Sequence, residues 1–256
     1  MKRLEVWTVA AGMAVLGAAV ALGEPGPGTW RAARGMSKGN AAEVVKVRSV
    51  AGEALAAGQT IRLEYAMPGL QAVKQPGVAD GQSALVLGNA PVSGDAGKPM
   101  LPVVPCYIAL PEGTELDGVD VVLGKETKLA GRHVVVHGQK PVPLLKDAKA
   151  EVTAPDAAVY GSDEPYPKAR CEVVTVQKKR GMSVVVVNLN PVVYRPKSGE
   201  VSYYGTMELQ VKVKAKKAAL GEAAEVQVRV REDTIRPLSE QVDNPAAVET
   251  YRAAMK

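Results

Sequence analysis

Two histidines and two cysteines are the residues of this sequence best suited to nucleophilic or metal chemistry. His133 and His137 lie four positions apart in a short apolar stretch that we expect to form a strand. At about 3.3 Å per residue their side chains would be roughly 13 Å apart, too far for both to bind one metal ion. They would share one face of the strand with Val135, and we expect the pair to face solvent and to form no site.

The two cysteines, Cys106 and Cys171, are candidates for a disulfide, because the N-terminal sequence predicts export to an oxidising compartment. A bridge would close a loop of about 65 residues and, in the chain-entropy model, stabilise the fold by roughly 4 kcal/mol. Two free thiols are the alternative, because separation along the sequence does not set the distance in space.

Other patterns that carry chemistry are missing. The sequence has no glycine-rich phosphate loop ending in Lys-Ser or Lys-Thr, no Cys-x-x-Cys motif and no calcium-binding loop. The acidic residues Asp117, Asp120, Asp163 and Glu164 are spaced too loosely to specify an ion, and we expect them in turns. The sequence therefore predicts no catalytic residue, no metal ligand and no cofactor, and favours a module that binds something.

The first 23 residues have the layout of a secretory signal peptide. Lys2 and Arg3 precede an almost uncharged apolar run from Val6 to Leu22, after which Glu24 to Gly28 is rich in proline and glycine. A membrane anchor is the alternative, since about 20 apolar residues can span a bilayer. We expect cleavage, a secreted, periplasmic or cell-surface protein, and contact with a membrane only through an uncleaved signal segment.

Charge and aromatic content argue against a nucleic-acid partner. The net charge is +5, and the densest basic cluster is Lys212, Lys214, Lys216 and Lys217. Nucleic-acid binding favours basic residues interleaved with aromatic ones on one face, whereas this chain has no Phe and only 4% aromatic residues. A solvated strand face explains the lysines better.

Residues 54–217 are dominated by strand patterns. Met207, Leu209, Val211 and Val213 alternate with polar residues, which is typical of a half-buried strand. Val184 to Val187 is continuously apolar and predicts a central strand covered on both faces, followed by a return strand after a turn with Gly199 in the left-handed conformation. Nine or ten short strands without crossover helices predict an all-β, antiparallel, jelly-roll-like β-sandwich.

The two flanks of this sandwich have different patterns. Residues 24–53 predict a loosely ordered leader with one short strand at Val44 to Val50. Residues 218–256 predict a last strand with alternating valines at 226, 228 and 230, then a linker and a helix from Ala246 to Met255. Asn244 is expected to cap that helix and Pro245 to occupy its first position.

Three ordered segments resemble the N-terminal pro-region of gingipain-type cysteine peptidases. These are Gly97-Lys-Pro-Met-Leu-Pro102 running on to Leu110-Pro-Glu-Gly113, Tyr160-Gly-Ser-Asp-Glu-Pro-Tyr-Pro167, and Arg180-Gly181 followed by Val184 to Pro196 and Gly199-Glu200. With the strands between them they cover residues 97–217, about half of the chain.

The resemblance implies a sandwich that precedes a peptidase domain in the same precursor, covers its active-site cleft, keeps the zymogen latent and assists folding. It also implies that a basic side chain on a projecting loop fills the primary specificity pocket of the peptidase. The matching stretch lies between the His133 strand and Tyr160 and offers Lys146 and Lys149. The alternative is that these lysines merely solvate the loop. Arg231 and Arg236 are candidate processing sites in the linker.

The catalytic Cys/His domain of that family does not occur in these 256 residues, so we expect no enzymatic activity from them. The parent precursor is expected to be a cysteine-type endopeptidase, and this chain either a truncated precursor or a pro-module alone. A second hypothesis is a surface adhesion or carbohydrate-binding sandwich, with Trp30, Tyr203 and Tyr204 as a sugar platform.

Overall fold

The computed structural model describes residues 31–33, 44–50, 56–74, 81–142, 151–216 and 232–255. The expected signal peptide and the expected strand around residues 226–230 lie outside these ranges. None of the helices in the described part combines the length and the apolar character needed to cross a bilayer.

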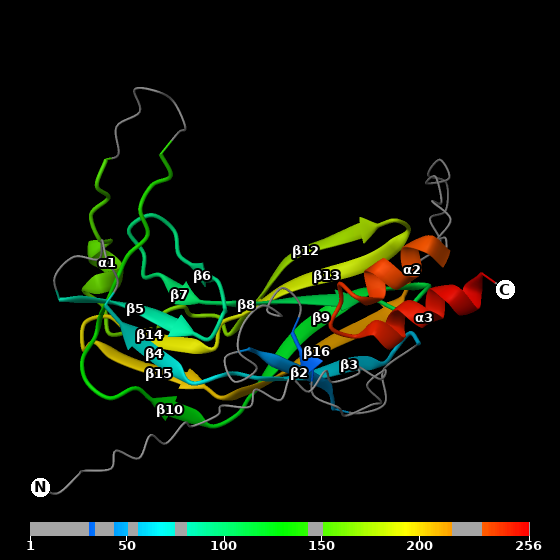
Figure 1. The fold of residues 1–256 in the computed structure, drawn as a ribbon, viewed down its shortest axis with the longest axis horizontal. Helices are drawn as coiled ribbons and strands as arrows, with labels where there is room; N and C mark the ends of the chain where they lie inside the picture. The colour runs from blue at the N-terminus through cyan, green and yellow to red at the C-terminus, as the bar shows by residue number, and fades with distance from the viewer. Residues whose placement is uncertain are drawn as a thin grey trace, which may run out of the picture.

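The described residues are mostly strands, as the sequence predicts (Figure 1). The strands are β1 (Arg31–Ala32), β2 (Lys46–Ser49), β3 (Thr60–Ala66), β4 (Leu70–Val73), β5 (Gln82–Leu87), β6 (Val92–Ser93), β7 (Leu101–Pro102), β8 (Val104–Ala109), β9 (Thr114–Leu123), β10 (Glu126–Lys128), β11 (Val134–Val135), β12 (Cys171–Lys179), β13 (Met182–Leu189), β14 (Val192–Arg195), β15 (Glu200–Tyr204) and β16 (Thr206–Ala215). The helices are α1 (Ala157–Tyr160), α2 (Glu232–Ser239) and α3 (Pro245–Ala254). The all-β class and the sandwich-like arrangement are confirmed.

One layer is an antiparallel five-stranded sheet in the order β1-β2-β3-β16-β9. Leu209 of β16 lies opposite Leu63 of β3 on one side and Val121 of β9 on the other. The alternation predicted for β16 is confirmed, because its apolar side chains from Met207 to Val213 are at most 2% exposed.

The polar face of β16 explains the basic cluster. Lys212 forms an ion pair with Asp120 at 2.7 Å, and Lys214 forms one with Asp117 at 3.1 Å. Both aspartates lie on β9 rather than in turns, which corrects the expectation for them. These lysines are therefore part of a solvated strand face, with opposite charges on the neighbouring strand.

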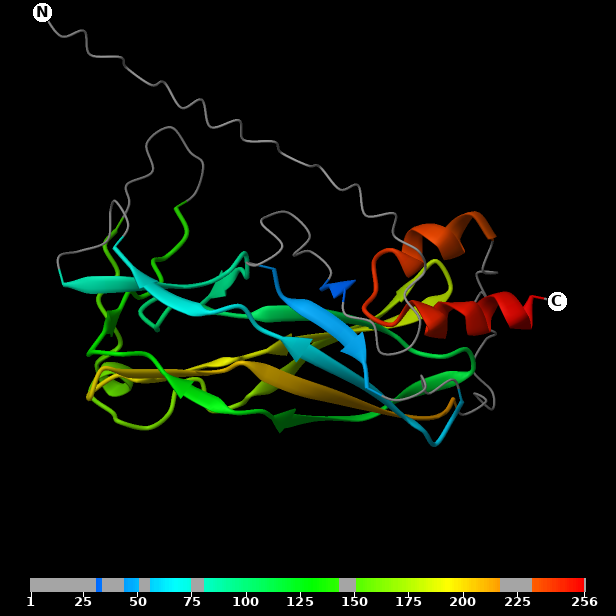
Figure 2. The same ribbon diagram turned by 60° about the horizontal axis from the view of Figure 1, so that its bottom comes forward.

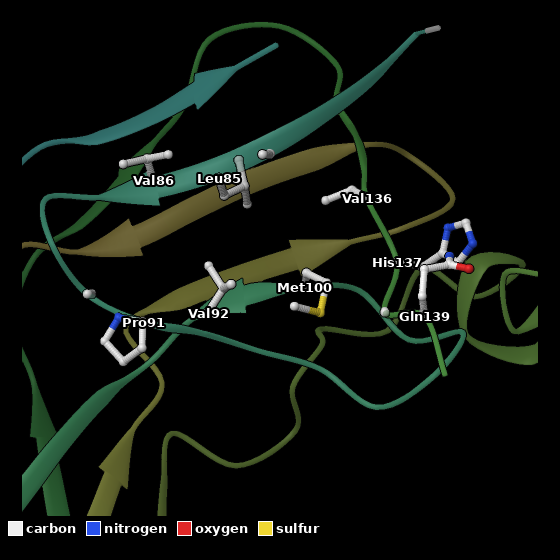
Figure 3. Close-up of a pocket in the computed structure, with 11 residues that line it drawn as sticks. Leu85, Val86, Pro91, Val92, Met100, Val136, His137 and Gln139 are labelled. Atoms are coloured by element: carbon white, nitrogen blue, oxygen red, sulfur yellow. The ribbon is translucent and has the colours of Figure 1, made fainter. Parts of the chain in front are cut away.

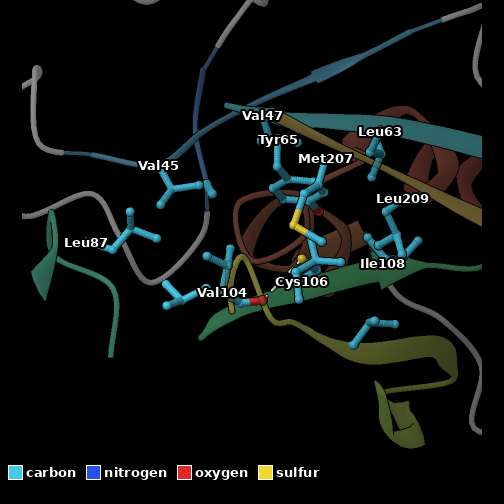
Figure 4. Close-up of a cluster of buried hydrophobic side chains, with 14 of the residues drawn as sticks. Val45, Val47, Leu63, Tyr65, Leu87, Val104, Cys106, Ile108, Met207 and Leu209 are labelled. Carbon is cyan, nitrogen blue, oxygen red and sulfur yellow. Dashed lines mark hydrogen bonds between the residues drawn. The ribbon is translucent and has the colours of Figure 1, made fainter. Parts of the chain in front are cut away.

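The second layer contains the sheet β12-β13-β8, with β13 in the centre. Val185 and Val187 of β13 face the main core, whereas Met182 and Val184 face α2 and α3. The predicted coverage of this strand on both faces is thus confirmed. In Figure 4, side chains from β3 and β16 meet those of β8 in the main core.

Two turns join strands of the second half of the chain. Arg180 and Gly181 link β12 to β13 with φ values of 52° and 87°, as in a type I′ turn. Gly199 lies in the turn between β14 and β15 and has the predicted positive φ, 71°. The described residues also form three smaller sheets, β10-β15-β14, β11-β5-β4 and β6-β7. In one of them, β11 pairs with β5 in parallel.

Three features of the flanks differ from expectation. The strand expected at Val44 to Val50 is present as β2, but it pairs with β3 and so belongs to the sandwich rather than to a loose leader. Helix α2 was not predicted. Helix α3 was, yet Asn244 makes no side-chain capping hydrogen bond. Figures 1 and 2 show α2 and α3 together near the C-terminus, at the end of the molecule away from α1.

Candidate functional site

The two cysteines are free thiols, so the structure does not contain the candidate disulfide. Cys106 on β8 lies opposite Val187 of β13, and Cys171 on β12 lies opposite Leu189 of the same strand. Strand β13 therefore separates them, and two inter-strand spacings of about 4.8 Å exceed the ~7 Å Cα separation that a disulfide tolerates. Burial raises the pKa of both thiols, which disfavours the reactive thiolate.

The histidines do not form a solvent-facing pair. Val135, on the face they were expected to share, is fully buried, whereas Val134 is 50% exposed. His133 donates from Nε2 to the carbonyl of Ala130 at 2.9 Å, and the half-buried His137 donates from Nε2 to that of Thr153 at 2.7 Å. Both rings thus bind backbone. Across the described ranges no three His, Cys, Asp or Glu side chains are grouped as a metal site.

The contact of His137 belongs to a clasp between the two arms of a projecting loop. The arms are residues 137–142 and 151–156, which leave the body beside α1 (Figure 1). Thr153 accepts at its carbonyl from His137, donates from its N–H to Gln139 Oε1 at 2.9 Å, and accepts at Oγ1 from the N–H of Lys140 at 3.1 Å. Three polar groups of one threonine therefore hold the arms together.

A glycine ties these arms to the body of the sandwich. Gly97 donates from its N–H to the carbonyl of Gly138 at 2.8 Å and accepts at its carbonyl from the N–H of Asp156 at 2.9 Å. Its φ is 82°, and a Cβ would lie 3.0 Å from the carbonyl oxygen of Ala154. Only glycine fits there without strain. This residue begins the first of the three segments that carry the family resemblance.

A set of tyrosines supports the same region. Asp156 caps α1 by accepting hydrogen bonds from the first turn. The Tyr160 hydroxyl donates to the carbonyl of Val135 at 2.8 Å, and its ring meets those of His137 and Tyr194 edge-on, with centroids 6.3 and 6.4 Å apart. Burial, followed by the neighbouring tyrosines, raises the pKa of Tyr160, so it remains a hydrogen-bond donor. The second and third resemblance segments meet here, since Tyr166 and Tyr194 exchange backbone hydrogen bonds of 2.8 and 2.9 Å.

A cavity of about 530 Å³ lies beside the first arm. Its walls are mainly apolar and include Leu85, Val86 and Met100, with His137 and Gln139 at one end (Figure 3). No Asp, Glu, Lys, Arg, Cys or Ser side chain lines it. The cavity can hold apolar groups but offers no chemistry for a reaction.

Of the four residues predicted to inhibit the peptidase or to be processing sites, the structure describes one. Lys146, Lys149 and Arg231 lie outside the described residues. Arg236 lies in α2, is exposed, and is 3.9 Å from Glu240 in an ion pair. Helical backbone is a poor protease substrate compared with an exposed loop, and the next residue, Pro237, has no N–H. The structure therefore disfavours Arg236 as a processing site.

The carbohydrate-binding hypothesis depends on three aromatic residues, and the two that the structure describes are poorly placed to contact a sugar. Tyr203 and Tyr204 are partly buried and pack against the main core, and Trp30 lies outside the described residues. The Gly-x-Ser-x-Gly spacing of serine hydrolases, which we expected to be absent from the sequence, does occur at Gly35 to Gly39. It too lies outside the described residues.

Comparisons with known proteins agree with this geometry. A similar solved structure concerns zymogenic latency of gingipain K from Porphyromonas gingivalis, with 19% identity, 60% of this chain and 86% of that chain covered, and a TM-score of 0.50. Another is a complex of Porphyromonas gingivalis RgpB pro- and mature domains, with 15% identity, 78% and 97% coverage, and a TM-score of 0.52. No curated protein matches the sequence.

These structural likenesses support the fold, and the family model described as Propeptide_C25 matches residues 53–241, most of the chain. That match contains β3 to β16, both arms of the projecting loop and α2. The chain belongs to the Propeptide_C25 family, the non-catalytic propeptides of gingipain-type cysteine peptidase precursors.

Proposed function

We propose that this propeptide keeps its cognate peptidase latent by laying the projecting loop into the active-site cleft while the sandwich covers the surroundings. The observation that carries the proposal is the clasp at Thr153, which ties both arms of the loop to each other. A loop whose ends are already held loses less conformational freedom on binding, so more of its contact energy remains as affinity.

Within this loop we propose Lys146 and Lys149 as the side chains that enter an acidic specificity pocket. Both lie between the arms. Lys146 follows the described end at residue 142 by four positions, and Lys149 precedes the described end at residue 151 by two. A basic side chain desolvated against a carboxylate is a typical anchor of such an interface. Processing at Arg231 is the matching proposal for release, since Arg236 is disfavoured by its helix.

Export is part of the same proposal. Latency is useful for a peptidase that passes through the cell before acting outside it, and residues 1–23 have the layout of a signal peptide. We propose a secreted or cell-surface destination, and assistance in folding of the peptidase as a second role. The gingipain K structure concerned with zymogenic latency and the RgpB complex of pro- and mature domains support the latency part of the proposal.

The test is an inhibition assay with the purified chain and a mature gingipain-type peptidase. We expect tight inhibition that Lys146→Ala, Lys149→Ala or the double variant weakens at least tenfold. Lys125→Ala, an exposed lysine between β9 and β10, is the matched control and should inhibit like the parent chain. An inhibition constant weaker than millimolar would exclude the inhibitory role, and full inhibition by the double variant would remove both lysines from it.

A variant of the clasp tests the structural part of the proposal. Thr153→Val keeps the shape of the side chain and removes the Oγ1 acceptor of the Lys140 N–H. We expect weaker inhibition, mainly through faster dissociation, with an unchanged melting temperature because the site is exposed. If Thr153→Val inhibits as tightly and dissociates as slowly as the parent chain, the clasp does not contribute to latency.

A further inference from the structure

Helices α2 and α3 are attached to the sandwich by a second apolar core, separate from the main one. Its members come from β8, β13, the two helices and the turn between them, and each is at most 4% exposed. They are Ala109, Met182, Val184, Ile235, Leu238, Val242, Ala247, Val248 and Tyr251. The outer face of β8 and β13 is thus covered by residues that lie far beyond these strands in the sequence.

The turn between α2 and α3 pairs with the free edge of β8. Asp243 donates from its N–H to the carbonyl of Tyr107 at 2.7 Å and accepts at Oδ2 from the Tyr107 N–H at 3.0 Å. Asn244 accepts at Oδ1 from the Ala109 N–H and donates from Nδ2 to the Ala109 carbonyl, both at 2.8 Å. The side-chain amide of Asn244 therefore replaces the peptide group that a neighbouring strand would offer to an edge.

Further hydrogen bonds fasten α3 beyond that edge. The Tyr251 hydroxyl donates to the carbonyl of Leu110 at 3.0 Å and accepts from the N–H of Ser183 at 3.1 Å. Thr250 Oγ1 accepts from the N–H of Glu112 at 2.9 Å. The turn and α3 thus both bind backbone groups of β8, of the residues directly after it and of β13.

We infer that residues 232–255 form a docking element that stays on the sandwich after the chain is cut between β16 and α2. Hydrolysis of one peptide bond there adds one water and leaves a carboxylate and an amine. None of the contacts described above is broken by it, because all of them lie on residues up to Ala215 or from Glu232 onward. The partner of the β8–β13 surface is therefore the C-terminal helix pair itself, held by contacts rather than by chain connection.

The docking of the helix pair is independent of the proposed function, whereas its consequence for the peptidase rests on that function. A peptidase joined after α3 would remain beside the sandwich once the linker is cut, so processing and loss of latency would be separate steps. The second step would require the helix pair to leave β8 and β13, or the sandwich itself to be degraded.

The experiment is to insert the recognition sequence of an exogenous site-specific protease between Gly221 and Glu222 of the full chain, cut it, and apply the product to size-exclusion chromatography. We expect both fragments in one peak and their separation only in denaturant. Elution of the C-terminal fragment by itself in native buffer would overturn the inference.

Two acidic substitutions on α3 make a matched pair for this assay. Val248→Asp puts a carboxylate into the second apolar core, and Ala253→Asp puts one on the exposed side of the same helix. We expect the cut Val248→Asp chain to separate and the cut Ala253→Asp chain to stay together. Equal retention in the two variants would contradict the role of this core.

A milder variant covers the case in which Val248→Asp disturbs the whole chain. Tyr251→Phe removes only the hydroxyl that joins Leu110 and Ser183, and it should speed fragment release about tenfold or more. If the Tyr251→Phe fragments separate at the same rate as those of the parent chain, the inference is contradicted. Inhibition of a peptidase is measured on the same samples, so retention without inhibition would refute the proposed function alone, and inhibition without retention would refute this inference alone.

Discussion

Asn244 is the residue whose replacement tests most directly how the C-terminal segment is attached. It is fully buried, and its amide makes two hydrogen bonds with the backbone of Ala109. Leucine has a similar size but neither a donor nor an acceptor. Asn244→Leu therefore leaves the N–H and the carbonyl of Ala109 on the β8 edge without partners, while it preserves the volume of the site.

The expected cost follows from those two groups. A buried polar group that loses its partner costs about 1–3 kcal/mol, so two groups cost about 2–6 kcal/mol. Burial of the leucine side chain offsets about 2 kcal/mol of this. We expect Asn244→Leu to lower the free energy of unfolding by about 0–4 kcal/mol, with a central value of about 2 kcal/mol. That central value is a substantial share of the typical ~5–15 kcal/mol of a domain.

The assay is urea unfolding at pH 7, followed by far-ultraviolet circular dichroism and compared at equal m-values. Asn190→Leu is the matched control, because the Asn190 amide donates only one hydrogen bond, to Ala169 in an exposed position. That change should cost less than about 1 kcal/mol. A loss for Asn244→Leu no larger than that of the control would refute the idea that its amide satisfies the β8 edge.

Three further predictions concern the turns, the thiols and acid stability. Arg180→Asn should raise the melting temperature and stabilise the fold by about 0.5–1 kcal/mol, because asparagine tolerates the left-handed conformation of the β12–β13 turn better; a lower melting temperature would contradict the turn assignment. Under native conditions iodoacetamide should modify Cys171 slowly and Cys106 not at all, and mass spectrometry after mild oxidation should find no bond between them. Hydrogen bonds from the side chain and then the backbone of Ser198 lower the pKa of Asp163, so its stabilising effect is present above the usual value of ~3.9 and is lost as the pH falls through the lower, folded-state pKa. The difference in stability between the parent chain and Asp163→Asn should therefore narrow between neutral and strongly acidic pH, and a constant difference would show that Asp163 does not titrate in this way.

Local pattern was enough to predict much of the fold. The alternation in β16 predicts one buried face, and the unbroken apolar run of β13 predicts two, because apolar side chains occupy the buried faces of a strand. The turn at Gly199 and the helix after Pro245 were also predictable, since both depend on the backbone preferences of single residues. The ordered proline- and glycine-rich segments indicated the family, which the match over residues 53–241 confirms.

The arms of the projecting loop could not be predicted, although they form the candidate site. Thr153 and Gln139 stand in stretches without a regular period, and nothing in their types marks them as partners. They meet because Gly97 and α1 bring the two arms together. His137 was placed on the wrong face for a similar reason, since alternation along a two-residue strand such as β11 gives no indication of which face is covered.

Sequence by itself determined the class of the fold, the central place of β13 and the family, because each depends on local periodicity or on ordered motifs. Tertiary structure alone decided that β13 separates Cys106 from Cys171, and that Asn244 pairs with β8 instead of capping α3. The physical reason is that both outcomes depend on the distance between segments remote in the chain, and only the packing of the sheets sets that distance.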